Sequence, residues 1–177
     1  AKIKKIMLNG NKVTMDKSNN DLLKLDFSNL KIKPATPLEL VFDYTLPLQI
    51  TNKKIEPFFI SSADNFYPRP ARNGKNDFRV TFNIKVETPE KLNVVSQGEK
   101  LSDFVKNSNR TVIWRENKPQ EEIILIADHY QVFTASHQSI SLYAYLYDND
   151  KALAKKYFKA TRSYIDLYSK LIAPYPY

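Results

Sequence analysis

The stretch FRVTFNIKVE, residues 78–87, carries the clearest secondary-structure pattern in the chain. Apolar residues occupy every second position from Phe78 to Val86, and polar or charged residues stand between them. A period of two is that of a β-strand with one buried face and one wet face, as in antiparallel sheets. This stretch therefore predicts an antiparallel β structure.

Similar signals extend to both sides of this strand. Asn9-Gly10-Asn11 separates two extended segments, 3–8 and 12–15, and predicts a hairpin. The segment 38–44 alternates with Leu38, Leu40, Phe42 and Tyr44 inward. Turns are expected at Thr88-Pro89, Gln97-Gly98, Asn107-Ser108-Asn109 and Lys118-Pro119. Further strands are predicted at 93–96, 101–105, 111–116, 123–127, 131–134 and 140–147.

The last part of the chain, residues 152–177, reads ALAKKYFKATRSYIDLYSKLIAPYPY and predicts one amphipathic helix. Asp148, Asn149 or Asp150 can cap its start, and Pro174 and Pro176 end it. The predicted fold is thus mainly β, an antiparallel sandwich or saddle-shaped sheet followed by one C-terminal α-helix. Residues three and four apart share one face of a helix, and Phe158, Ile165 and Ile172 lie beside this face and widen it. The face itself consists of Leu153, Tyr157, Thr161, Tyr164, Tyr168 and Leu171.

Composition sets bounds on function. The chain has 177 residues, 42% of them hydrophobic, which suffices for a packed core without a metal or disulfide. It has no cysteine and carries a net charge of +8, of which residues 1–150 contribute only +3. The basic C-terminal helix suggests either a nucleic-acid or membrane surface or, as we favour, the solvated face of a helix packed on a neighbouring domain. Basic residues are not interleaved with aromatics as in a nucleic-acid groove.

Catalytic motifs are missing from the sequence. Its two histidines, His129 and His137, do not form an HExxH pair, and there is no GxSxG or glycine-rich phosphate loop. One segment stands out, SSADNFYPRPARNG at residues 61–74, which is long and rich in aromatic residues and proline. It is either an ordinary surface loop or a loop that reaches a ligand or a neighbouring domain.

A series of segments, in order along the chain, resembles the N-terminal domain of aminopeptidase N-like zinc metallopeptidases. KIKKIMLNGNKV (2–13) looks like that family's first hairpin, and PLELVFDYTLPL (37–48) like a following strand. The run from Phe66 to Leu101 looks like its aromatic-proline turn and next strands. Trp114 before Lys118-Pro119, and then IILIADHYQVF, also fit. The ending YSKLIAPYPY resembles the segment that opens the catalytic domain in that family.

The resemblance implies a domain organisation and a function. Residues 1–147 would form a β-sandwich domain that lacks its first strands, and 148–177 the start of a truncated catalytic domain. The β domain would be non-catalytic, pack on the catalytic domain and wall the substrate cleft, with peptide substrate as the ligand of the parent enzyme. Zinc and its HExxH ligands would lie after the PYPY segment, so no catalytic or metal residue and no cofactor is expected in this chain. Neither nucleic acid nor a membrane segment is expected.

The loop that begins at Ser61 contains the residues that, by the resemblance, would border the substrate cleft. Classical members carry Gln or Glu before the aromatic-proline turn, where it holds the substrate's amino terminus. Here Ser61, Ser62 and Asp64 occupy this region and Tyr67 follows, so these four are the substrate-cleft candidates. Asp64 is one methylene shorter than Glu, which leaves the aminopeptidase role open.

A second class of function is a β-sandwich module that binds protein or carbohydrate without catalysis. Tyr143, Tyr145 and Tyr147 would form an exposed aromatic row if the alternate residues of the same strand face inward. The alternative is that both faces of the strand are covered, one of them by the catalytic domain. If the tyrosines are exposed, an empty glycan or protein binding screen would count against the binding module.

Overall fold

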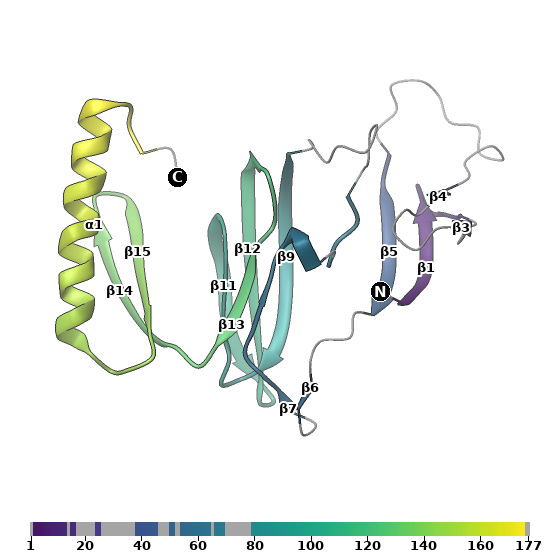
Figure 1. Cartoon of the computed structure of the whole chain (residues 1–177), viewed down its shortest axis with the longest axis horizontal. Helices are drawn as coiled ribbons and strands as arrows, with labels where there is room; N and C mark the ends of the chain where they lie inside the picture. The colour runs from purple at the N-terminus through teal and green to yellow at the C-terminus, as the bar shows by residue number, and fades with distance from the viewer. Residues whose placement is uncertain are drawn as a thin grey trace. The chain divides into compact units, whose positions relative to one another are not determined.

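The computed structural model confirms a mainly antiparallel β fold with one α-helix near the C-terminus of the described chain (Figure 1). The chain divides into two compact units, 1–50 with 66–68, and 51–65 with 69–177. The structure describes residues 2–13, 15–16, 24–25, 38–45, 50–51, 54–64, 66–69 and 79–175.

The first unit is built on a three-stranded sheet in the order β2-β1-β5. Asn9 and Gly10 both have positive φ, 47° and 81°, as a two-residue hairpin turn requires, so the predicted hairpin is confirmed. The returning strand is short, because β3 pairs with β4. Its strands are β1 (Lys2–Leu8), β2 (Asn11–Lys12), β3 (Met15–Asp16), β4 (Lys24–Leu25) and β5 (Leu40–Thr45).

The core of the first unit consists of Ile6, Leu8 and Val13, with Phe42 packed against it. Leu38 and Leu40, predicted to face inward, are 47% and 38% exposed. Leu38 precedes β5 and Leu40 is its first residue, so the alternation that partly buries Phe42 leaves the start of the strand exposed.

The second unit contains a β-sandwich made of two three-stranded sheets, β10-β13-β8 and β11-β12-β9. Buried side chains from both sheets form one cluster, and the Trp114 indole N–H donates to the Val94 carbonyl oxygen at 3.3 Å. The sandwich strands are β8 (Phe58–Ile60), β9 (Val80–Pro89), β10 (Asn93–Ser96), β11 (Glu99–Lys106), β12 (Asn109–Gln120) and β13 (Leu125–Asp128). Before them, β6 (Ile50–Thr51) and β7 (Lys54–Ile55) form a two-stranded sheet.

The strand predicted at 78–87 is confirmed as β9, where half-buried and exposed residues alternate from Val80 to Glu87. Phe78 lies outside the described residues. Two predicted turns are wrong. Pro89 ends β9 and pairs with Asn109, because the last position of a strand at the edge of this sheet needs no amide donor. Pro119 lies in a β-bulge of β12, between Glu116 and Gln120, where β12 is not paired with β9, so its missing amide hydrogen costs no hydrogen bond of the sheet.

The remaining elements are a hairpin and the helix that covers it. β14 (Gln131–His137) pairs with β15 (Ile140–Leu146), and α1 (Lys151–Leu171) lies along this hairpin (Figure 1). The Asp150 carboxylate accepts a hydrogen bond from the Leu153 amide at 2.9 Å, so Asp150 is the N-cap among the three predicted candidates.

Candidate functional site

The segment that follows β8 forms a tight turn with its own hydrogen bonds. Ser62–Asp64 is a single 3₁₀ turn, η1. The Asp64 carboxylate accepts from the Ser61 amide at 2.8 Å, and Ser61 Oγ accepts from the Ala63 amide at 3.3 Å. Three of the four predicted cleft residues are thus brought together in one turn.

Glu122 fixes this turn from a distant part of the chain. Its Oε2 accepts two hydrogen bonds from Ser62, one from the hydroxyl at 2.6 Å and one from the amide at 3.2 Å. Both bonds favour the ionised carboxylate, so the Ser62 hydroxyl first, and then the Ser62 amide, lower the pKa of Glu122, with a smaller contribution from the positive charge of Arg69.

Gln97 extends the same network to a third segment. Its side-chain amide donates to the Glu122 carbonyl oxygen at 3.0 Å and accepts from the Ile124 amide at 2.9 Å. Ile60, Leu125 and Ser96 lie side by side in the ladder of β8, β13 and β10, so the three segments meet at one end of this sheet.

The sequence did not single out Glu122 or Gln97. Glu122 lies 60 residues from its partner Ser62, and Gln97 was expected only as part of a turn before Gly98. A glutamate in a short connection between two strands has no local feature that separates it from other solvated acids. Only the pairing of β8 with β13 reveals its role.

Tyr67, the fourth predicted residue, belongs to the first unit. Its ring contacts that of buried Phe66 edge to face, with centroids 4.8 Å apart. The Phe66 carbonyl oxygen also accepts a hydrogen bond from the Tyr44 hydroxyl. Tyr67 is therefore supported by an aromatic contact separate from the Ser62–Glu122 network.

Helix α1 packs on the hairpin through a narrow row of side chains. Ala154 and Phe158 are buried against Leu142 and Ala144, and Ile165 is partly buried beside them. We call Ala154, Phe158 and Ile165 the packed face. At the far end of the hairpin, His137 Nε2 lies 2.6 Å from Asp166 Oδ1, and Arg162 donates to the Ser136 carbonyl oxygen at 3.0 Å.

A second apolar face of α1 is exposed, and we call it the open face. The sequence pattern merged the two faces into one stripe, whereas the structure buries Phe158 and leaves Tyr157, Tyr164 and Tyr168 at least 50% exposed. The Tyr164 and Tyr168 rings stack with centroids 6.2 Å apart. The open face comprises Tyr157, Tyr164, Leu167, Tyr168, Leu171, Ile172 and Tyr175.

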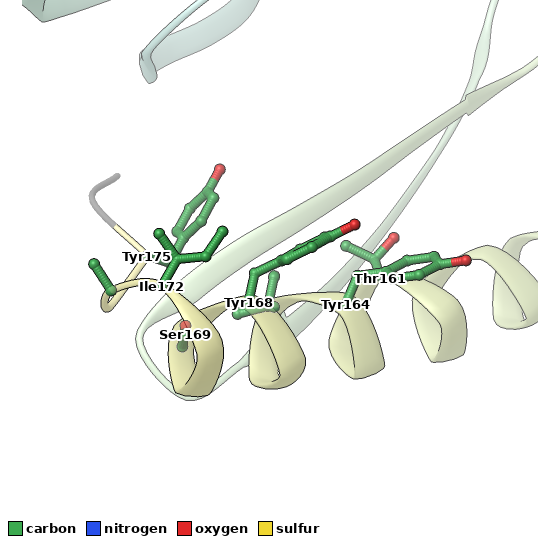
Figure 2. Close-up of a pocket in the computed structure, with 8 residues that line it drawn as sticks. Thr161, Tyr164, Tyr168, Ser169, Ile172 and Tyr175 are labelled. Atoms are coloured by element: carbon green, nitrogen blue, oxygen red, sulfur yellow. The ribbon is translucent and has the colours of Figure 1, made fainter.

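The end of the open face is hollowed into a groove of about 430 Å³ (Figure 2). Tyr164 and Tyr168 project from the same side of the helix, and Tyr175 turns back towards them from the segment after it. The groove is almost wholly apolar, and its lining residues are Thr161, Tyr164, Ile165, Tyr168, Ser169, Ile172, Ala173 and Tyr175. Such a surface fits another apolar protein surface better than a polar small molecule.

Solved structures of zinc metallopeptidases resemble this arrangement. A two-domain M1 zinc metallopeptidase variant bound to L-arginine matches with a TM-score of 0.64 at 15% identity, over 99% of this chain and 44% of that chain. An M1 zinc metallopeptidase variant from Deinococcus radiodurans gives the same values. A two-domain M1 variant bound to L-tryptophan matches with a TM-score of 0.60 at 13% identity, with the same coverage. This chain shares its fold with part of these enzymes.

The likeness is one of fold, and the chain spans less than half the length of the metallopeptidases it matches. No protein family model matches the sequence, and neither does any curated protein. Within the described residues there is no group of three or more His, Cys, Asp or Glu side chains that could hold a metal ion. These residues therefore do not fit a zinc centre like that of a metallopeptidase. Among the described helices, none has the length and apolar character needed to span a bilayer.

The tyrosine row of β15 is only partly exposed. Leu142 and Ala144 face inward as predicted, and Tyr143 and Tyr147 are 39% and 69% exposed. Between them, Tyr145 is half-buried, and burial raises its pKa to about 12, with smaller contributions from nearby Tyr143 and Asp103. The row is thus interrupted, and it does not form a continuous platform for a sugar chain.

Tyr147 and Tyr143 make separate contacts at the two ends of this row. The Tyr147 hydroxyl donates to the Asp128 carboxylate at 3.0 Å, and its ring lies against that of Tyr130. The Lys100 ammonium group lies 4.7 Å from the centre of the Tyr143 ring. These contacts connect the hairpin to the β-sandwich.

Proposed function

We propose that this chain is the non-catalytic β domain of a zinc metallopeptidase of the aminopeptidase type, and that it packs on the catalytic domain and walls the substrate cleft. The fold supports this proposal, since 99% of the chain matches part of a two-domain M1 zinc metallopeptidase. In this proposal residues 1–147 are the β domain, and residues 148–177 begin the catalytic domain.

The open face of α1 is the observation that carries the proposal: the packed face joins α1 to the β domain, and the open face is the surface that would contact the rest of the catalytic domain. Its seven side chains are 47–79% exposed. Taking an aromatic or large aliphatic side chain as roughly 200 Å², they expose roughly 800 Å² of mostly apolar surface. The largest apolar patch of a typical monomer is about 300–600 Å², and one side of a standard protein interface is about 800 Å². A helix with apolar residues on both sides is normally buried between two layers, and the hairpin supplies only one.

The turn at Ser61–Asp64 supports the cleft-wall part of the proposal. Ser62 and Asp64 lie in a connection held at one end of the sheet by Glu122, and rigid loops at the ends of sheets are common sites for ligand contacts. We propose Ser61, Ser62 and Asp64 as cleft-side residues, and Tyr67, which belongs to the first unit, as a separate candidate. Because Asp64 already accepts the Ser61 amide, it would bind a substrate amine only through its remaining lone pairs.

Zinc and the catalytic side chains belong to the catalytic domain in this proposal. The described residues contain no group of three or more side chains that could hold a metal ion, which is compatible with a zinc centre in the other domain. Peptide substrate would be bound between the two domains of the parent enzyme, and neither nucleic acid nor a membrane segment takes part.

The test uses the parent reading frame, expressed both whole and as this chain plus the remaining part. The whole protein should retain zinc and cleave aminoacyl amides, whereas this chain alone should do neither. The two parts should bind each other, and Tyr164→Asp with Tyr168→Asp should weaken binding by at least about 100-fold, as for loss of two central aromatic contacts.

Ser163→Asp is the matched control, since it introduces the same residue beside Tyr164 on the exposed polar side of α1. It should leave binding unchanged. A reading frame without an HExxH motif would overturn the metallopeptidase proposal. Equal effects of the control and the tyrosine variants would overturn the assignment of the open face.

The second candidate function, a module that binds protein or carbohydrate, rests on the exposure of Tyr143 and Tyr147. Tyr147→Ala should then abolish the binding of any ligand that a glycan or protein binding screen identifies. An empty screen with the folded chain would count against this function.

A further inference from the structure

We propose that Glu122 is a positioning residue, whose carboxylate holds the turn after β8 in a single conformation at the end of the sheet. The inference rests on the proposed function only in its kinetic consequence, because the contacts themselves lie within one unit of the fold.

The geometry is that of a two-point clamp. One carboxylate oxygen of Glu122 receives both the hydroxyl of Ser62, at 2.6 Å, and its amide, at 3.2 Å. Two donors from one residue on one oxygen fix the backbone as well as the side chain of Ser62. Charge-assisted bonds of this kind are stronger than neutral ones.

Hydrogen bonds from Gln97 and Ser96 keep the Glu122 segment itself in place. Gln97 binds the Glu122 carbonyl oxygen and the Ile124 amide, and the Ser96 hydroxyl donates to the Ile124 carbonyl oxygen at 2.8 Å. The linker between β12 and β13 is therefore tied to the end of β10. This arrangement makes Glu122 a fixed point against which the turn is held.

Local hydrogen bonds alone do not attach the turn to the sheet. The Asp64 carboxylate accepts from the Ser61 amide, and the Asp64 amide donates to the Ser61 carbonyl oxygen at 3.1 Å. Both bonds are internal to the turn and would persist if the turn moved as a body. The two hydrogen bonds from Ser62 to Glu122 connect the turn to the linker between β12 and β13.

The neighbouring charges define how the clamp responds to pH. Arg69 favours the ionised carboxylate of Glu122, Asp64 faces the turn itself, and Glu121 lies 3.9 Å from Arg79 with both side chains well exposed. The bonds from Ser62 lower the pKa of Glu122, so the clamp is complete above the ordinary pKa of a glutamate and opens as pH falls through the lowered value.

The experiment compares Glu122→Gln with Glu121→Gln, the same change one residue earlier, in the 177-residue chain. Hydrogen exchange of the Ser62 amide, followed by NMR, should be about tenfold faster in Glu122→Gln and unchanged in Glu121→Gln, because the glutamine oxygen carries no negative charge and both bonds from Ser62 weaken. The ratio between Glu122→Gln and the unmodified chain should approach one as the solution is acidified. Equal exchange in the two variants would overturn the clamp.

The same two variants in the parent enzyme test what the clamp does. If the turn borders the cleft, Glu122→Gln should raise KM for peptides about threefold or more while kcat stays within about twofold, because a displaced wall affects binding before chemistry. Faster Ser62 exchange with unchanged KM would keep the clamp and refute the cleft-wall part of the proposed function. The two failures are thereby distinguishable.

Ser62→Ala keeps the experiment decisive if Glu122→Gln does not fold. It removes the hydroxyl donor and leaves the amide bond, so its effect on exchange at residues 62–64 should be smaller and in the same direction. Glu122→Asp should restore less protection than glutamate, since its carboxylate is one methylene shorter. A Ser62→Ala chain with unaltered exchange throughout the turn would contradict the role of the hydroxyl and with it the clamp.

Discussion

Replacing Phe158 with alanine should lower the free energy of unfolding of the hairpin and helix by about 3 kcal/mol. Phe158 is 8% exposed and packs among Leu142, Ala144 and Ala154. Phenylalanine-to-alanine changes in cores cost about 3–5 kcal/mol. The lower end applies here because α1 has one covered side only and can settle onto the hairpin after the ring is removed.

The matched control for this change is Tyr157→Ala. Tyr157 directly precedes Phe158 and is 50% exposed, so its removal should change the free energy of unfolding by no more than about 0.5 kcal/mol. The two variants differ by one position and test which face of α1 is packed.

Urea denaturation measures both variants with two probes. Far-ultraviolet circular dichroism follows α1, and fluorescence follows Trp114, the single tryptophan, which is buried in the β-sandwich. Phe158→Ala should lower the helix transition, and the Trp114 transition shows whether the two cores unfold together. A loss in Tyr157→Ala equal to that in Phe158→Ala would refute the assignment of the packed face.

Three further predictions concern stability. Asp150→Ala removes the N-cap of α1 and should cost about 1 kcal/mol, measured by thermal denaturation with circular dichroism. Gly98→Ala should cost more than Gly10→Ala in chemical denaturation: both glycines have positive φ, but a Cβ at Gly98 would lie 2.2 Å from the Arg115 carbonyl oxygen, whereas at Gly10 nothing lies within 4 Å. The free energy of unfolding should fall as pH rises from the ordinary tyrosine pKa towards 12, because Tyr145 loses its proton at a lower pH in the unfolded chain than in the folded one. Tyr145→Phe should make this fall less steep, as measured by urea denaturation at several pH values. The same change removes a buried hydroxyl that has no hydrogen-bond partner among the described residues.

Much of the fold was predictable because its signals are local. The alternation in β9, the Asn9-Gly10 turn and the limits of α1 each follow from backbone preferences and a short-range pattern. The prolines were harder, since Pro89 and Pro119 are both typical of turns and yet lie at a strand end and a bulge. Which of these applies depends on the partner strand, and a single strand does not encode its partner.

The candidate site was predictable only in part. The sequence drew attention to Ser61, Ser62 and Asp64 through an unusual loop and a family resemblance, and the structure joins them in one turn. It did not predict Glu122 or Gln97, because their contacts depend on strands that pair across the sheet.

The sequence by itself determined that the chain is mainly β, that a hairpin turn lies at Asn9-Gly10, and that a helix rich in apolar residues follows the strands. Only the tertiary structure decided that Phe158 packs while Tyr164 and Tyr168 stay exposed, and that Ser62 binds Glu122. The physical reason is the range of the interactions. Local patterns set the backbone of each element, whereas the choice between two apolar faces of one helix depends on which other surface reaches it.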